Sequence, residues 1–112
     1  MVKFIDREEL KNEILDMTLI DVRKPTQYKM AHIQGAENMP MEQLTEDAEK
    51  KFSHEKKIVI YGEDQNSGEK AAKQLEDIGF QRVTLYKNGF KDWRQAHMPV
   101  KKVNLGQKRR EM

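Results

Sequence analysis

The sequence predicts an α/β domain, with a central, mostly parallel sheet of about five strands and helices on both of its faces. Two observations lead to this prediction. Short apolar and β-branched runs alternate along the chain with stretches whose apolar residues recur at helical spacing. One run, residues 58–61, is apolar without a break, which is typical of a central strand covered on both faces. At 112 residues the chain has the length of one domain, and we expect that domain to cover residues 1–100.

Five short runs are predicted to be strands because they are rich in β-branched, aromatic or other apolar residues. In chain order they cover residues 4–5, 18–22, 36–39, 58–61 and 83–86. The third run is bracketed by Gly35 and Pro40, and the last is followed by an Asn-Gly turn.

Three helices in the first half of the chain are predicted from sequence signals at their N-termini. Asp6 and Glu9 have the spacing of a capping box, which opens a helix to about residue 15. Pro25 suits the first turn of a short second helix, because its missing N–H is not needed there. Acidic residues after Thr45 favour a third helix, since they lie near its positive end.

The second half predicts two more helices. One runs from residue 67 or 68 to residue 78, with an apolar stripe, a cap at Ser67 and a stop at Gly79. Its stripe consists of Ala71, Ala72, Leu75 and Ile78. The final helix follows the Asn-Gly turn and ends before Pro99.

The composition excludes several classes of site. The chain contains no Cys, so it has no disulfide and no thiolate metal site. No apolar run approaches the ~20 residues that cross a membrane, and no apolar signal core opens the chain. We expect a cytoplasmic protein with no metal, no cofactor and no membrane contact.

The positive charge is concentrated at the C-terminus. The net charge is +2, and residues 101–112 contribute +4, which leaves −2 for residues 1–100. The basic residues therefore form a C-terminal tail and not a nucleic-acid-binding face, so nucleic acid is disfavoured as a partner. The only motif that would favour it is Lys108-Arg109-Arg110.

Five sequence blocks occur in the order and at the spacing of a known family. They are Asp21-Val22-Arg23, the nine residues from His32 through Gly35 to Pro40, the strand at 58–61, the stripe ending at Gly79-Phe80, and Asn88-Gly89 followed by Trp93. Together they resemble the rhodanese-like (sulfurtransferase) family. The resemblance implies a rhodanese-like fold over most of the chain.

The same resemblance places the active-site loop at Gly62, Glu63, Asp64, Gln65, Asn66, Ser67 and Gly68. In active members the first of these positions is the nucleophilic Cys, and here it is Gly62. Covalent sulfur transfer needs a thiolate, and this chain has none. We therefore expect a catalytically inactive domain that acts as a binding or regulatory module. The alternatives are an accessory protein in sulfur transfer and a Cys-less variant of an active thiosulfate sulfurtransferase.

The remaining family positions are expected to be structural. Asp21 and Arg23 should form an ion pair at a strand end. His32 should donate to a backbone carbonyl and fix the turn at Gly35, and Trp93 should lie in the core.

The predicted loop carries two acids and no base. Its acids either fold inward onto the loop N–H groups or form a negative rim. Both arrangements disfavour anions, so the expected partner is a protein segment or a small cationic or neutral molecule.

Overall fold

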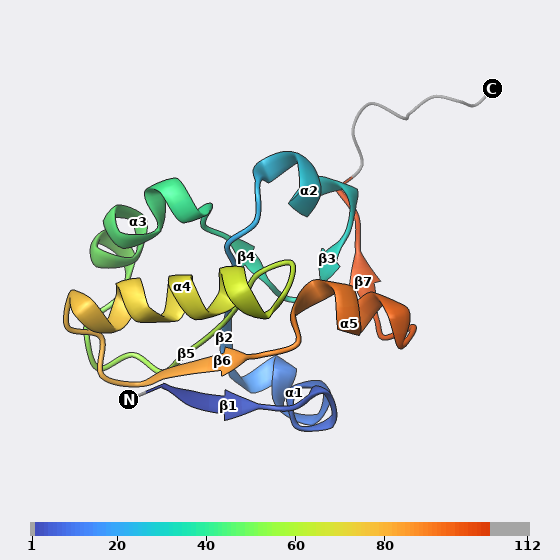
Figure 1. Cartoon of the computed structure of the whole chain (residues 1–112), viewed down its shortest axis with the longest axis horizontal. Helices are drawn as coiled ribbons and strands as arrows, with labels where there is room; N and C mark the ends of the chain where they lie inside the picture. Colours follow the sequence, from blue (N-terminus) through green and yellow to red (C-terminus); the bar gives the residue numbers. More distant parts are fainter. Residues whose placement is uncertain (1, 104–112) are drawn as a thin grey trace.

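The computed structural model describes residues 2–103, and it confirms the predicted α/β fold (Figure 1). The strands are β1 (Lys3–Ile5), β2 (Thr18–Asp21), β3 (His32–Ile33), β4 (Glu37–Asn38), β5 (Ile58–Tyr61), β6 (Val83–Tyr86) and β7 (Val100–Lys101). The helices are α1 (Arg7–Glu13), α2 (Pro25–Met30), α3 (Leu44–Lys51), α4 (Gln65–Asp77) and α5 (Gly89–Gln95), with short 3₁₀ turns at Ile14–Asp16 and Met41–Gln43. Five strands form one parallel sheet in the order β1-β6-β5-β2-β4.

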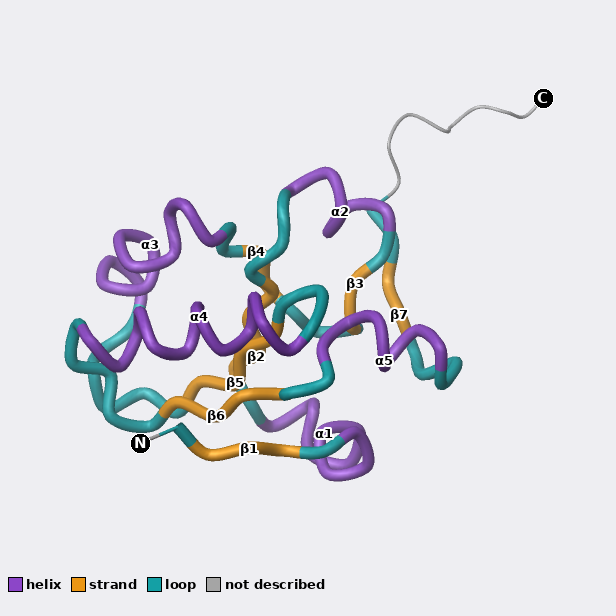
Figure 2. The backbone as a smooth tube through the Cα atoms, in the orientation of Figure 1, coloured by secondary structure: helices purple, strands orange, loops and turns teal. Residues whose placement is uncertain are grey.

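A second, two-stranded sheet pairs β3 with β7 in antiparallel register. The two strands run beside each other next to α5 (Figure 2). Neither strand was predicted, because two residues are too few to show the side-chain alternation of a strand. Lys101, the first residue of the predicted tail, belongs to β7, and the amide of Val103 donates to the carbonyl of Lys29 at 3.0 Å. Residues 104–112 of the predicted tail lie outside the described residues.

The alternation of side chains along the strands divides the core into two layers. One layer joins the sheet to α3 and α4, and it contains Ile20, Val22, Ile58, Ile60, Val83 and Leu85. The other joins the sheet to α1 and α5, and it contains Leu19, Val59, Tyr61, Tyr86, Leu10, Phe90 and Trp93. Helices therefore cover both faces, as predicted, and β5 is buried along its whole length.

The capping box predicted for α1 is confirmed. The Asp6 carboxylate accepts from the amide of Glu9 at 2.8 Å, and the Glu9 carboxylate accepts from the amide of Asp6 at 3.0 Å. The predicted cap of α4 is wrong, because the N-cap is Asp64 and the helix begins at Gln65. Its first turn is polar, so the apolar stripe used for the prediction marked only the later turns.

The start of α5 packs against the segment that follows β5. The amides of Phe90 and Lys91 donate to the carbonyls of Gly62 and Glu63, at 2.9 and 3.1 Å. This close approach requires Gly89, whose φ is +77°. A Cβ atom there would lie 2.6 Å from the carbonyl oxygen of Glu63.

We expect Gly89→Ala to lower the free energy of unfolding by about 2–5 kcal/mol, combining left-handed backbone strain with overpacking. Gly35→Ala is the matched control. Gly35 also has a positive φ, +95°, but its Cβ atom would have no neighbour closer than 4.0 Å. The control should lose only about 1–2 kcal/mol in urea unfolding. Equal losses would contradict the packing role of Gly89.

Trp93→Ala should lower the free energy of unfolding by about 3–5 kcal/mol. The Trp93 side chain is 1% exposed, lies edge-on to Tyr86 and donates from Nε1 to the carbonyl of Pro99 at 2.8 Å. Chemical unfolding followed by circular dichroism measures the loss. Native-state tryptophan fluorescence like that of free indole would contradict the burial.

Candidate functional site

The predicted active-site loop lies at the C-terminal end of β5, and it is shorter than the sequence suggested. Only Gly62, Glu63 and Asp64 lie between β5 and α4. The other four predicted loop residues, Gln65, Asn66, Ser67 and Gly68, form the first turn of α4. Four of the seven residues expected in the loop are therefore helical, because Asp64 caps α4 early.

Gly62 is buried, and the space for a side chain at this position is filled. A Cβ atom on Gly62 would lie 2.3 Å from Ser67 Oγ and 3.0 Å from both Ser67 Cβ and the Gly68 amide nitrogen. Gly68 in turn lets α4 approach β6, since a Cβ atom there would lie 2.8 Å from Leu85 Cδ1. The residue at the nucleophile position is thus closely packed by the helix that follows it.

The two acids of the loop have different partners. The Asp64 carboxylate accepts from both the amide and the hydroxyl of Ser67, each at 3.1 Å. These two hydrogen bonds hold the pKa of Asp64 below its ordinary value. Glu63 accepts from Arg23 Nη1 at 3.2 Å. Asp64 thus follows the inward arrangement, because it accepts from the amide of Ser67, whereas Glu63 pairs with Arg23, a base outside the loop.

Asp21 and Arg23 form a buried ion pair at the end of β2. Arg23 Nη2 donates to the Asp21 carboxylate at 2.9 Å and to the carbonyl of Ala31 at 2.6 Å. The Tyr61 hydroxyl also donates to Asp21, at 2.6 Å. Burial and the neighbouring Asp21 carboxylate raise the pKa of Tyr61, so its hydroxyl keeps its proton.

The other family positions, His32, Gly35 and Trp93, make their contacts away from the loop. His32 Nδ1 lies 2.8 Å from the carbonyl of Tyr28 and therefore carries the donated proton, while the two rings stack at 3.7 Å. Gly35 takes the positive φ of its turn, and Trp93 is held by Pro99. Asp21 and Arg23 are thus the family positions that connect to the loop, through Glu63.

A groove between α2 and α5 opens beside the loop. Its volume is about 440 Å³, and its lining residues are Arg23, Gln27, Met30, Ala31, Glu63, Phe90, Lys91, Arg94 and Gln95. The Arg23 guanidinium lies 4.0 Å from the centre of the Phe90 ring. Met30 is 74% exposed at the edge of the groove.

The charge of this groove corrects the expectation of an acidic pocket. Arg23, Lys91 and Arg94 line it, against the single acid Glu63, which is already paired with Arg23. The expected charge was based on the loop residues alone, whereas two of the bases that line the groove, Lys91 and Arg94, come from α5. Their i, i+3 spacing on a helix was the signal that could have indicated a shared basic face.

The described residues were also searched for two other kinds of site. Within residues 2–103, no group of three or more His, Asp or Glu side chains could hold a metal ion. None of the helices in that range is long and apolar enough to span a membrane.

Known proteins resemble this chain in sequence and in structure. The protein YqhL of Bacillus subtilis is 30% identical over 93 residues, which cover 83% of this chain and 73% of YqhL. The thiosulfate sulfurtransferase GlpE of Vibrio cholerae is 32% identical over 85 residues, covering 73% of this chain and 76% of GlpE.

The solution structure of a rhodanese-like domain from an Anabaena protein superimposes with a TM-score of 0.85 at 26% identity. The match covers 100% of this chain and 88% of that domain. The family model described as the rhodanese-like domain matches residues 6–96. The order of the strands, the position of the loop and these matches agree, and the chain belongs to the rhodanese-like domain family.

Proposed function

We propose that this protein is a catalytically inactive rhodanese-like domain that acts as a binding or regulatory module. The observation that carries the proposal is Gly62 at the C-terminal end of β5, in a chain without any Cys. Sulfur transfer through a persulfide requires a thiolate, and a hydroxyl does not replace it as a reversible sulfur carrier. The relatives include a thiosulfate sulfurtransferase, so the activity is lost in a scaffold related to active enzymes.

The packing of Ser67 supports the same conclusion. Its Oγ donates to the Asp64 carboxylate and fills the space beside Gly62. A hydroxyl held in this way has no neighbouring His to activate it, because its described polar partners are groups of Asp64. Ser67 is therefore a packing and capping residue.

The basic groove between α2 and α5 is the surface that suits a ligand best. Lys91 and Arg94 are exposed, and neither forms an ion pair with another described residue. Met30 and Phe90 line the same groove and add apolar surface near the two bases. An acidic protein segment with an apolar side chain matches both features, since the carboxylates can pair with the bases while the apolar group covers Met30.

The proposal also keeps three expectations from the sequence. These are a cytoplasmic location, a domain over residues 1–100, and a basic tail over residues 101–112, of which Lys101 is paired with the domain in β7. The tail adds positive charge to a chain whose α2–α5 groove is already basic, which favours the same acidic partner.

The purified protein should form no thiocyanate from thiosulfate and cyanide, and mass spectrometry should detect no persulfide. Gly62→Cys should restore little activity and should lower the melting temperature, because its Cβ atom meets Ser67. Gly62→Ala, with the same Cβ atom and no thiol, should show the same loss of stability. Combining Gly62→Cys with Ser67→Ala should recover part of the lost stability and raise turnover, because the 2.3 Å contact with Oγ is removed. The 3.0 Å contacts with the Cβ atom of residue 67 and with the Gly68 amide nitrogen remain. Turnover by the unmodified protein above a heat-treated control would contradict the proposal.

Binding in the groove is measured by titrating ¹⁵N-labelled protein with a glutamate-rich peptide that contains one leucine. The double variant Lys91→Gln/Arg94→Gln should weaken binding about twofold to thirtyfold, as two exposed ion pairs predict. The matched control Lys70→Gln/Lys73→Gln removes the same charge from α4. Equal weakening by the control, or tighter binding of a lysine-rich peptide, would contradict this site.

A further inference from the structure

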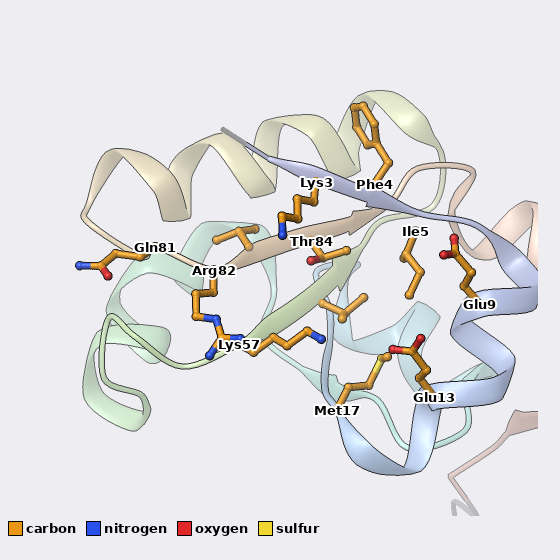
Figure 3. Close-up of a pocket in the computed structure, with 12 residues that line it drawn as sticks. Lys3, Phe4, Ile5, Glu9, Glu13, Met17, Lys57, Gln81, Arg82 and Thr84 are labelled. Carbon is orange, nitrogen blue, oxygen red and sulfur yellow. The ribbon is translucent and has the colours of Figure 1, made fainter.

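A second cavity lies at the opposite end of the sheet, where the parallel strands β1, β6 and β5 begin (Figure 3). Its volume is about 260 Å³. This is slightly below the ~300–1,000 Å³ of sites for drug-sized ligands, so an occupant must be small. The cavity shares no lining residue with the groove between α2 and α5.

Strand alternation brings three bases to this cavity. Lys3 lies on β1, Arg82 directly precedes β6, and Lys57 directly precedes β5. Each is followed two residues later by a smaller residue on the same face: Ile5, Thr84 and Val59, respectively. The side chain of Phe4, between Lys3 and Ile5, points to the other side of the sheet (Figure 3).

The three bases are exposed and have no partner of opposite charge. None of Lys3, Lys57 and Arg82 forms a hydrogen bond or an ion pair through its side chain with another described residue. Figure 3 shows the Lys57 ammonium directed into the cavity and the Lys3 side chain descending from β1 toward it. Together they form the positive end of the cavity.

The other end of the cavity is acidic. Glu9 and Glu13 project from successive turns of α1, on the side opposite Lys57 (Figure 3). Glu9 uses one carboxylate oxygen in the capping box, whereas Glu13 has no side-chain partner among the described residues. Apolar surface from Ile5, Met17 and Val59 lies between the two charged ends.

We propose that this cavity binds a small zwitterion of the short-peptide class, whose ammonium and carboxylate are separated by an apolar body. The carboxylate would lie toward Lys57 and Arg82, the ammonium toward Glu13, and the apolar side chain on Met17 and Val59. The bases attract a simple anion, but the acids repel it. The acids attract a simple cation, but the bases repel it. Only a ligand with both charges pairs with both ends. This proposal does not depend on the function proposed above.

The test is a titration of the ¹⁵N-labelled full chain with leucine and, in a separate arm, with leucyl-leucine. Amide shifts should change at residues 3–5, 57–59 and 82–84 with leucyl-leucine, whereas leucine, whose two charges lie on one carbon, should bind several-fold more weakly. The one-ended analogues N-acetyl-leucyl-leucine and leucyl-leucine amide should also bind several-fold more weakly than leucyl-leucine. Absence of shift changes with leucyl-leucine at millimolar concentration, or equal binding of leucine or of a one-ended analogue, would overturn the proposal.

Variants locate the two ends. Lys57→Gln and Glu13→Gln should each weaken binding about threefold to fivefold, as expected for an exposed ion pair. The matched controls are Lys70→Gln and Glu55→Gln, which change the same charges at exposed positions outside the cavity. Unchanged binding in Lys57→Gln and Glu13→Gln, or equal weakening in the controls, would also overturn it. All four positions are exposed, so the variants should fold.

Discussion

The buried carboxylate of Asp21 is the group on which the C-terminal edge of the sheet depends. It is fully buried, and it accepts from the Tyr61 hydroxyl, from the backbone amide of Arg23 and from the Arg23 guanidinium. A buried charge without such partners would destabilise the fold by about 3–5 kcal/mol, so the three donors are a requirement of the site. Asn38 extends the arrangement to β4, because its side-chain amide donates to the carbonyls of Asp21 and Arg23. The Asp21 carboxylate thereby ties the end of β2 to β5, and the backbone carbonyls of Asp21 and Arg23 tie it to β4.

Arg23 transmits this arrangement to the segment that follows β5. Its guanidinium is held by Asp21 and by the carbonyl of Ala31, lies over the Phe90 ring, and reaches Glu63 with its remaining nitrogen. The first residues after β5 are therefore fixed from one side by Arg23 and from the other by the amides that begin α5. Gly62, the first residue after β5, is closely packed by Ser67. The contacts that hold the end of β5 come from Asp21, Arg23 and the start of α5, and none of them requires a thiolate.

The two ends of the parallel sheet have different chemical surroundings. At the C-terminal ends of the strands, buried polar groups and the start of α5 surround a groove whose free charges are positive. At the N-terminal ends, the sheet face is left open between the edge strand β1 and helix α1, so that charged side chains surround an apolar patch. The difference follows from the connections, because the C-terminal loops fold over the sheet and pair their polar groups. At the other end, Lys3 on β1 is exposed, and so are Lys57 and Arg82, which directly precede β5 and β6.

Structural features that depend on a few neighbouring residues could be predicted from the sequence. The capping box of Asp6 and Glu9, the strand at residues 58–61 and the missing thiol at Gly62 each depend on a few neighbouring residues, and so did the expected pairing of Asp21 with Arg23. Three other features became clear only from the three-dimensional structure. The polar first turn of α4 carries no apolar period, the pairing of β3 with β7 joins residues distant in the chain, and the charge of the groove comes from bases on α5. Periodicity and caps are properties of one segment, whereas the partner of a charge or a strand depends on where the chain returns, and that is set by packing.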